Sequence, residues 1–149
     1  MNRENILYRI LYSHFLEQTF SVATGRIDKL LSVACIILGL AVTGDFFPEL
    51  SGALVVVLVS VQVTGGFREK SANAMKKSAE YLQLFDDEEA YSDSDLKGRL
   101  KALEITDGNI WSSVKHIAML KAQIKMDVPA EQRERLPLKS RLICLLVGD

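Results

Sequence analysis

Two long stretches of the sequence contain no charged residue, and a short acidic segment separates them. The first occupies residues 30–44 and reaches about 18 residues when it is extended past Asp45 through two phenylalanines to residue 47, and the second occupies residues 50–67 and also has about 18 residues. A helix of that length, rising about 1.5 Å per residue, nearly crosses a hydrocarbon core of roughly 30 Å. The connecting residues 44–49 include glycine, proline and two acids, which favour a turn. The pattern predicts a two-helix transmembrane hairpin over residues 29–67, with spans at about 30–47 and 50–67.

Basic residues lie on the outer sides of both apolar stretches. Arg26 and Lys29 precede the first stretch, Arg68 and Lys70 follow the second, and the connecting turn carries only acids. Loops rich in lysine and arginine remain on the cytoplasmic side of a membrane. We therefore expect a lipid bilayer as a partner, with both termini cytoplasmic. The alternative is a soluble bundle with two buried helices, but a chain of 149 residues could hardly cover two helices that are apolar all round.

The remaining sequence predicts further helices and makes the expected fold an all-α membrane protein. Residues 1–28 show the spacing of an N-terminal amphipathic helix, and residues 68–128 that of a cytoplasmic helical domain in which Ser92 or Ser94 caps one helix. The second span either continues straight into this domain or bends at its paired glycines, residues 65–66. Residues 129–149 form a basic and then apolar tail, too short for a third span, which is expected to dock on anionic lipid or on a partner subunit.

The sequence contains no motif that indicates catalysis or cofactor binding. It has no phosphate-binding glycine loop, no HExxH helix, no CxxC pair and no GxSxG turn. His14 and His116 lie in separate helical segments, and Cys35 and Cys144 do not form a metal-ligand cluster. A net charge of -1 disfavours nucleic-acid binding. We therefore expect no enzyme, no cofactor, no metal site and no nucleic-acid partner.

The chemically unusual residues of the hairpin are the polar ones in its second stretch. Gln62 shares a helix face with Val55 and Val59, while Ser60 and Thr64 lie one turn apart on another face. Polar side chains in hydrocarbon normally face protein or water. Two helices cannot enclose a path, so these five residues are candidate pore-lining residues of a homo-oligomer. The alternative for serine and threonine is a hydrogen bond to a carbonyl of their own helix.

The layout resembles the SLATT family of two-transmembrane bacterial effectors. The resemblance covers most of the chain and is one of architecture and spacing: an amphipathic N-terminal helix, a tight hairpin, then a helical region that begins FREKSA at residues 67–72 and includes AEYL at residues 79–82. It implies a bacterial inner membrane location and a role in anti-phage defence or mobile-element conflict. It further implies pore assembly in response to a sensor protein or a nucleotide signal.

These observations lead to two functional hypotheses. The first is an oligomeric membrane pore or membrane-disrupting effector, in which the hairpins ring an opening and the cytoplasmic helices assemble and gate it. The second is a non-conducting membrane adaptor or superinfection-exclusion protein that holds a partner through its cytoplasmic helices. In the first the hairpin carries the activity, whereas in the second it is an anchor.

Overall fold

The protein is built entirely of helices over the part of the chain that the structure describes. The computed structural model describes residues 2–44, 47–105, 108 and 110–148. The all-α class is thereby confirmed. The helices are α1 (Arg3–Thr43), α2 (Pro48–Gly65), α3 (Phe67–Asp86), α4 (Asp93–Glu104), α5 (Ser112–Lys125) and α6 (Leu138–Val147), with short 3₁₀ helices η1 (Glu88–Ala90) and η2 (Ala130–Gln132).

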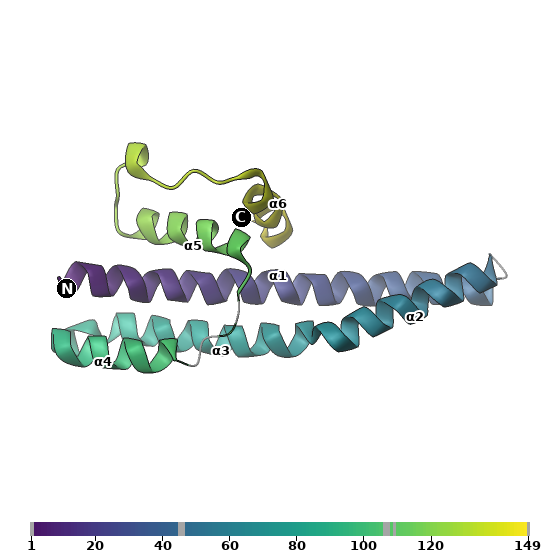
Figure 1. Ribbon diagram of the computed structural model, residues 1–149, viewed down its shortest axis with the longest axis horizontal. Helices are drawn as coiled ribbons and strands as arrows, with labels where there is room; N and C mark the ends of the chain where they lie inside the picture. The colour runs from purple at the N-terminus through teal and green to yellow at the C-terminus, as the bar shows by residue number, and fades with distance from the viewer. Residues whose placement is uncertain (1, 45–46, 106–107, 109, 149) are drawn as a thin grey trace.

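Helix α1 is a single helix of 41 residues. At about 1.5 Å per residue it is roughly 60 Å long. Figure 1 shows it running the whole length of the molecule. Its first part, residues 3–28, lies among α3, α4, α5 and α6, which together we call the head. Its last part, residues 29–43, runs beside α2, and these two segments form a projecting arm. The boundary expected between an N-terminal helix and a hairpin therefore lies inside one helix.

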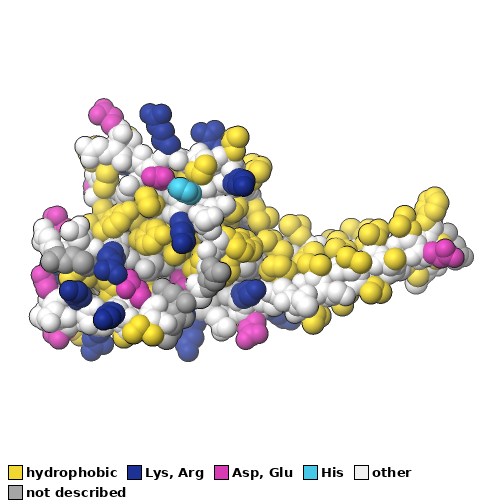
Figure 2. Space-filling model, in the orientation of Figure 1, with side chains coloured by type: hydrophobic (Ala, Val, Ile, Leu, Met, Phe, Trp, Pro, Cys, Tyr) yellow, Lys and Arg dark blue, Asp and Glu magenta, His cyan; other side chains and the backbone are white. Residues whose placement is uncertain are grey.

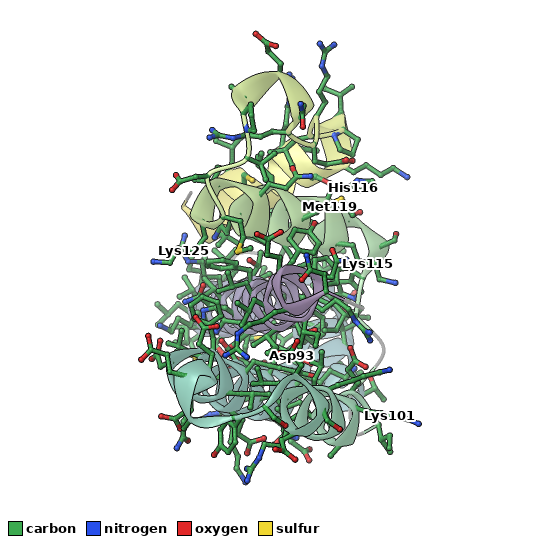
Figure 3. The ribbon with its side chains drawn as sticks, turned by 90° about the vertical axis from the view of Figure 1, so that its left-hand side faces the viewer. Asp93, Lys101, Lys115, His116, Met119 and Lys125 are labelled. Atoms are coloured by element: carbon green, nitrogen blue, oxygen red, sulfur yellow. The ribbon has the colours of Figure 1, made fainter. Side chains whose placement is uncertain are left out.

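The head has α1 between two groups of helices. Figure 3, which looks along α1, shows α3 and α4 on one side and α5 on the other. Two apolar clusters hold these layers together. One consists of Ile6, Ile10, Tyr81, Leu84, Leu96 and Leu100, and the other of Phe20, Ala74, Ile110 and Val114. Both clusters draw on α1, so its N-terminal half is the central element of the head's core.

A joint at Gly66 separates the arm from the head on the second side of the hairpin. Helix α2 ends at Gly65, α3 begins at Phe67, and Gly66 between them has a left-handed backbone with φ of 56°. Glycine adopts this conformation without the steric cost that a Cβ atom imposes. Of the two possibilities that the sequence allowed, the bend at the paired glycines is the one found.

The sequence also predicted a cap at the start of α4 and a turn between α1 and α2. The hydroxyl of Ser92 accepts a hydrogen bond from the backbone N–H of Asp95 at 3.2 Å, which confirms one of the two predicted caps. At the tip of the arm, α1 ends at Thr43 and α2 begins at Pro48. Asp45 and Phe46, in the predicted turn, lie outside the described residues.

One helix of the described chain is long and apolar enough to cross a membrane. It runs from Pro48 to Asp86, counted through the joint at Gly66. The uncharged end of α1, residues 30–43, is shorter, because Arg26, Asp28 and Lys29 precede it. At about 1.5 Å per residue those residues extend roughly 21 Å, which is less than a hydrocarbon core of roughly 30 Å. The second span of the predicted hairpin therefore remains a proposal.

Replacing a glycine by alanine should have opposite effects on the free energy of unfolding at Gly66, in the joint, and at Gly98, within α4. Gly66→Ala should lower the free energy of unfolding by about 1 kcal/mol, because alanine is strained at positive φ. Gly98→Ala should raise it by about 0.5–1 kcal/mol, because Gly98 lies within α4 and a Cβ atom there meets nothing within 4 Å. Thermal unfolding of detergent-solubilised protein, followed by circular dichroism, measures both. Equal effects of the two substitutions would contradict a specific joint at Gly66.

Candidate functional site

The arm exposes apolar side chains around most of its circumference. Exposed fractions reach 62% at Ile36, 67% at Leu40, 65% at Val56 and 75% at Val63. Figure 2 shows this apolar surface along the projecting part of the molecule, whereas charged side chains gather on the head. Soluble monomers rarely expose contiguous apolar patches larger than a few hundred Å². The arm therefore presents a surface suited to lipid or to other apolar helices.

Inside the head, α1 and α3 also meet through polar side chains, which lie beside the apolar clusters. His14 is buried, and its Nδ1 lies 2.8 Å from the carbonyl oxygen and 3.0 Å from the hydroxyl of Ser78. Two helical turns further along α1, the hydroxyl of Ser21 donates to the carbonyl of Ser71 at 2.7 Å. The hydroxyl of Ser71 donates back to the carbonyl of Ser21 at 2.8 Å. These reciprocal bonds cross-link the two helices at the base of the arm.

The same contact line continues towards the arm through a glycine. A Cβ atom at Gly25 would lie 2.9 Å from the Ser71 hydroxyl, so glycine permits the close approach of α1 and α3. Residues 14, 21, 25, 28 and 32 recur every three, four or seven positions and so share one face of α1. We call this face, with Ser78, Ser71 and Gln62 opposite, the polar seam. Small and polar residues on facing helices are typical of helix association in membranes.

Gln62 completes the polar seam within the arm. Its side-chain nitrogen donates to a carboxylate oxygen of Asp28 at 3.0 Å and to the hydroxyl of Ser32 at 2.9 Å. The Ser32 hydroxyl in turn donates to the backbone carbonyl of Asp28 at 2.9 Å. Both protons of the Gln62 amide are therefore used between α2 and α1. This network joins residues 30 and 34 positions apart and fixes the register of the two arm helices.

The structure separates the five predicted pore-lining residues into two groups. Gln62 and Val55 are half-buried on the side of α2 that faces α1, and Val59 is 43% exposed at its edge. Ser60 and Thr64 are exposed on the opposite side. The hydroxyl of Ser60 donates to the carbonyl of Val56 at 2.7 Å, and that of Thr64 donates to the carbonyl of Ser60. A single copy thus does not bring the two groups together.

The four cations that were predicted to flank the membrane also differ in their surroundings. Arg26 donates to the backbone carbonyl of Leu146 at 2.8 Å, near the end of α6. Lys29 and Arg68 line a pocket of about 360 Å³ at the base of the arm, together with Asp28. Neither of them forms an ion pair with any residue that the structure describes. Lys70 lies at the edge of a different cavity, in the head.

The head cavity lies between α1 and α3 and has a volume of about 470 Å³. Lys70, Asn73 and Lys77 line it from α3, and Glu17, which is only 3% exposed, lines it from α1. Phe20 and Ile110 add apolar walls. Sequence reasoning missed this cavity, because its charged residues come from helices about 50 positions apart and no local pattern links them.

A second polar cluster lies on the far side of the head. His116 on α5, labelled in Figure 3, has its Nδ1 2.9 Å from a carboxylate oxygen of Glu134. Burial, with a smaller contribution from Glu134, raises the pKa of the Tyr8 phenol. Burial likewise raises the pKa of Tyr12. Both phenols therefore remain neutral at physiological pH.

Comparison with known proteins finds no relative. No protein-family model, curated protein or solved structure matches the chain. Among the described residues, no three histidines, cysteines, aspartates or glutamates are grouped so that they could hold a metal ion. The arm with its polar seam and the head cavity are therefore the features from which function is argued.

The Gln62 network predicts an energetic coupling between the two arm helices. Gln62→Leu should destabilise the protein by about 1 kcal/mol, because it removes two hydrogen bonds between helices. A double-mutant cycle with Asp28→Ala should show a clear interaction energy. Ser60→Ala is the matched control and should be nearly neutral, since its hydroxyl bonds only within α2. Additive effects of the Gln62 and Asp28 substitutions in thermal unfolding would rule the coupling out.

Proposed function

We propose that the chain is an integral membrane protein whose arm crosses a bilayer as a two-helix hairpin, with the head and both chain ends on the cytoplasmic side. The supporting observation is the bare apolar arm. Between Lys29 and Arg68 the only charged residues in the sequence are Asp45, in the segment that connects α1 to α2, and Glu49, in the first turn of α2. In the proposed orientation the cations at its base remain at the cytoplasmic surface, as loops rich in lysine and arginine do. Lys29 reaches the headgroups by extending its side chain, which compensates for the short apolar end of α1.

The arms of several copies associate into a conducting oligomer in this proposal. On the side of α2 away from α1, Ala53, Val57, Ser60 and Thr64 recur at helical spacing and are all exposed. Such a face of small and weakly polar residues packs well against another transmembrane helix. Ser60 and Thr64 are then the residues available to line a shared path, whereas Gln62 holds each hairpin together. This proposal narrows the set of five pore-lining residues that were predicted from the sequence, in which Gln62 was the main candidate.

The biological setting of this proposal follows the resemblance to SLATT effectors. Opening of the oligomer would depolarise a bacterial inner membrane during phage infection or conflict between mobile elements. The trigger reaches the head, either as a partner protein or as a nucleotide signal. The cavity between α1 and α3, with its lysines and the buried Glu17, offers a place in the described head for a small charged molecule.

Planar-bilayer recording of the purified protein tests the pore. Thr64→Val should reduce conductance, because it replaces an exposed hydroxyl with a methyl group of similar size on the proposed lining face. Thr43→Val makes the same replacement at the end of α1, where the hydroxyl donates to the Leu40 carbonyl, and should leave conductance unchanged. Intact oligomers that carry no current under any applied voltage would refute the conducting function.

A non-conducting adaptor is the second candidate, and the Gln62 network favours it. Because that amide donates both protons within one hairpin, the polar seam does not require another copy. In this case the head binds a partner protein and the arm serves as an anchor.

Exchange of the arm discriminates between the two functions. Residues 30–65 are replaced by an unrelated hairpin of equal length, and the effect of the chain on phage infection is compared before and after. A pore should lose its activity, whereas an adaptor should retain it. Membrane fractionation after a carbonate wash checks that the exchanged protein is inserted.

A further inference from the structure

Helix α6 carries an exposed leucine face at the end of the head that borders the arm. Leu138, Leu142 and Leu145 recur at the spacing of one helix face, and their exposed fractions are 77%, 67% and 77%. These values are as high as those of the arm itself. A leucine face of this kind on a helix of only ten residues calls for something that covers it.

The opposite face of α6 is the one attached to the head. Ser140 is fully buried there, and its hydroxyl donates to the backbone carbonyl of Ser113 at 2.7 Å. Val147 is also buried, and Ile143 packs against the cluster that contains Phe20. The helix therefore directs a serine inwards and its leucines outwards. A helix on the surface of a soluble protein has the reverse arrangement.

Two cations flank the leucine face. At about 100° per residue, Lys139 lies on one side of the leucines and Arg141 on the other. Both side chains are exposed. Residues 138–147 contain no acidic residue. An apolar face bordered by cations is the pattern of helices that lie in the surface of a membrane containing anionic lipids.

The position of α6 fits this pattern. Figure 1 shows α6 beside α1 at the end of the head that is nearer the arm, and α6 is foreshortened in a view where α1 lies in profile, so the two helices run in different directions. Arg26, which is three residues before Lys29 on α1, holds α6 in this position through its hydrogen bond to the backbone carbonyl of Leu146. If the arm crosses the bilayer, a helix that runs across α1 at this level lies along the membrane surface. In Figure 2 apolar side chains extend from the arm onto this part of the head.

We propose that α6 is an interfacial helix, which inserts Leu138, Leu142 and Leu145 between the headgroups of anionic lipids around the base of the arm. Lys139 and Arg141 bind the lipid phosphates on either side. This inference rests on the proposed membrane insertion of the arm and adds a second, separate membrane contact. A second copy of α6 is a poorer occupant, because pairing two such faces brings cations together with no acid on either helix.

Tryptophan fluorescence with brominated lipids tests the proposal on the full chain. In a Trp111→Phe background, which removes the natural tryptophan, single tryptophans replace Leu142, Val56 or Ile124. Leu142 reports on α6. Val56 reports on the arm, where it is 65% exposed and lies outside the face of α2 that is proposed to pack against other copies. Ile124, which is 48% exposed on α5 near its C-terminal end, is the matched control on the head. The protein is reconstituted in phosphatidylcholine vesicles with and without phosphatidylglycerol, and bromine is placed on the upper acyl chain.

The expected result is strong quenching and a blue shift at Leu142→Trp and Val56→Trp, with little quenching at Ile124→Trp. Quenching at position 142 should weaken when phosphatidylglycerol is omitted or when Lys139 and Arg141 are both changed to glutamine. Quenching at position 56 without quenching at position 142 overturns the interfacial role of α6 and leaves the arm inserted. A blue shift at position 142 without quenching also overturns it and identifies another copy of the chain on that face. No quenching at position 56 overturns the proposed membrane insertion itself, and the inference with it.

Discussion

The unbroken backbone hydrogen bonding of α1 connects the head to the arm along a single axis. Its N-terminal half supplies Ile6, Ile10 and Phe20 to the two apolar clusters, and its C-terminal half is one of the two arm helices. Most stability of a helix in a protein comes from packing of one face. Here the packed head stabilises the first half of α1, and the exposed half continues from it without a new nucleation step.

Along α1 the side chains that contact the neighbouring helices change from apolar to polar, although they lie on the same face of the helix. Apolar residues meet α3 and α4 at the start, His14 and Ser21 meet serines of α3 in the middle, and Asp28 and Ser32 meet Gln62 at the base of the arm. Hydrogen bonds specify one register more strictly than apolar contacts do, because a displaced donor loses its acceptor. In a lipid environment, where apolar surfaces gain little by leaving solvent, such bonds and close backbone approach are the main means of holding two helices in register.

Much of the helical layout could be predicted from the sequence, because its signals are local. Ser92 caps α4 through a residue three positions away, and the paired glycines interrupt the chain between α2 and α3. The continuity of α1 was not predicted, because the change from amphipathic to apolar composition near residue 28 suggested a boundary. Backbone hydrogen bonds do not depend on that change. The partners of Gln62 and the residues around the head cavity depend on packing between distant segments, which a single sequence does not specify.

The joint at Gly66 gives the two connections between head and arm unequal stiffness. Helix α1 passes from head to arm as a continuous rod, whereas the other connection is interrupted by a left-handed residue. A rearrangement of α3 in the head therefore cannot push the arm along its axis, because α1 fixes its length. In the proposed pore, such a rearrangement would instead tilt α2 at the joint and change the direction in which Ser60 and Thr64 face.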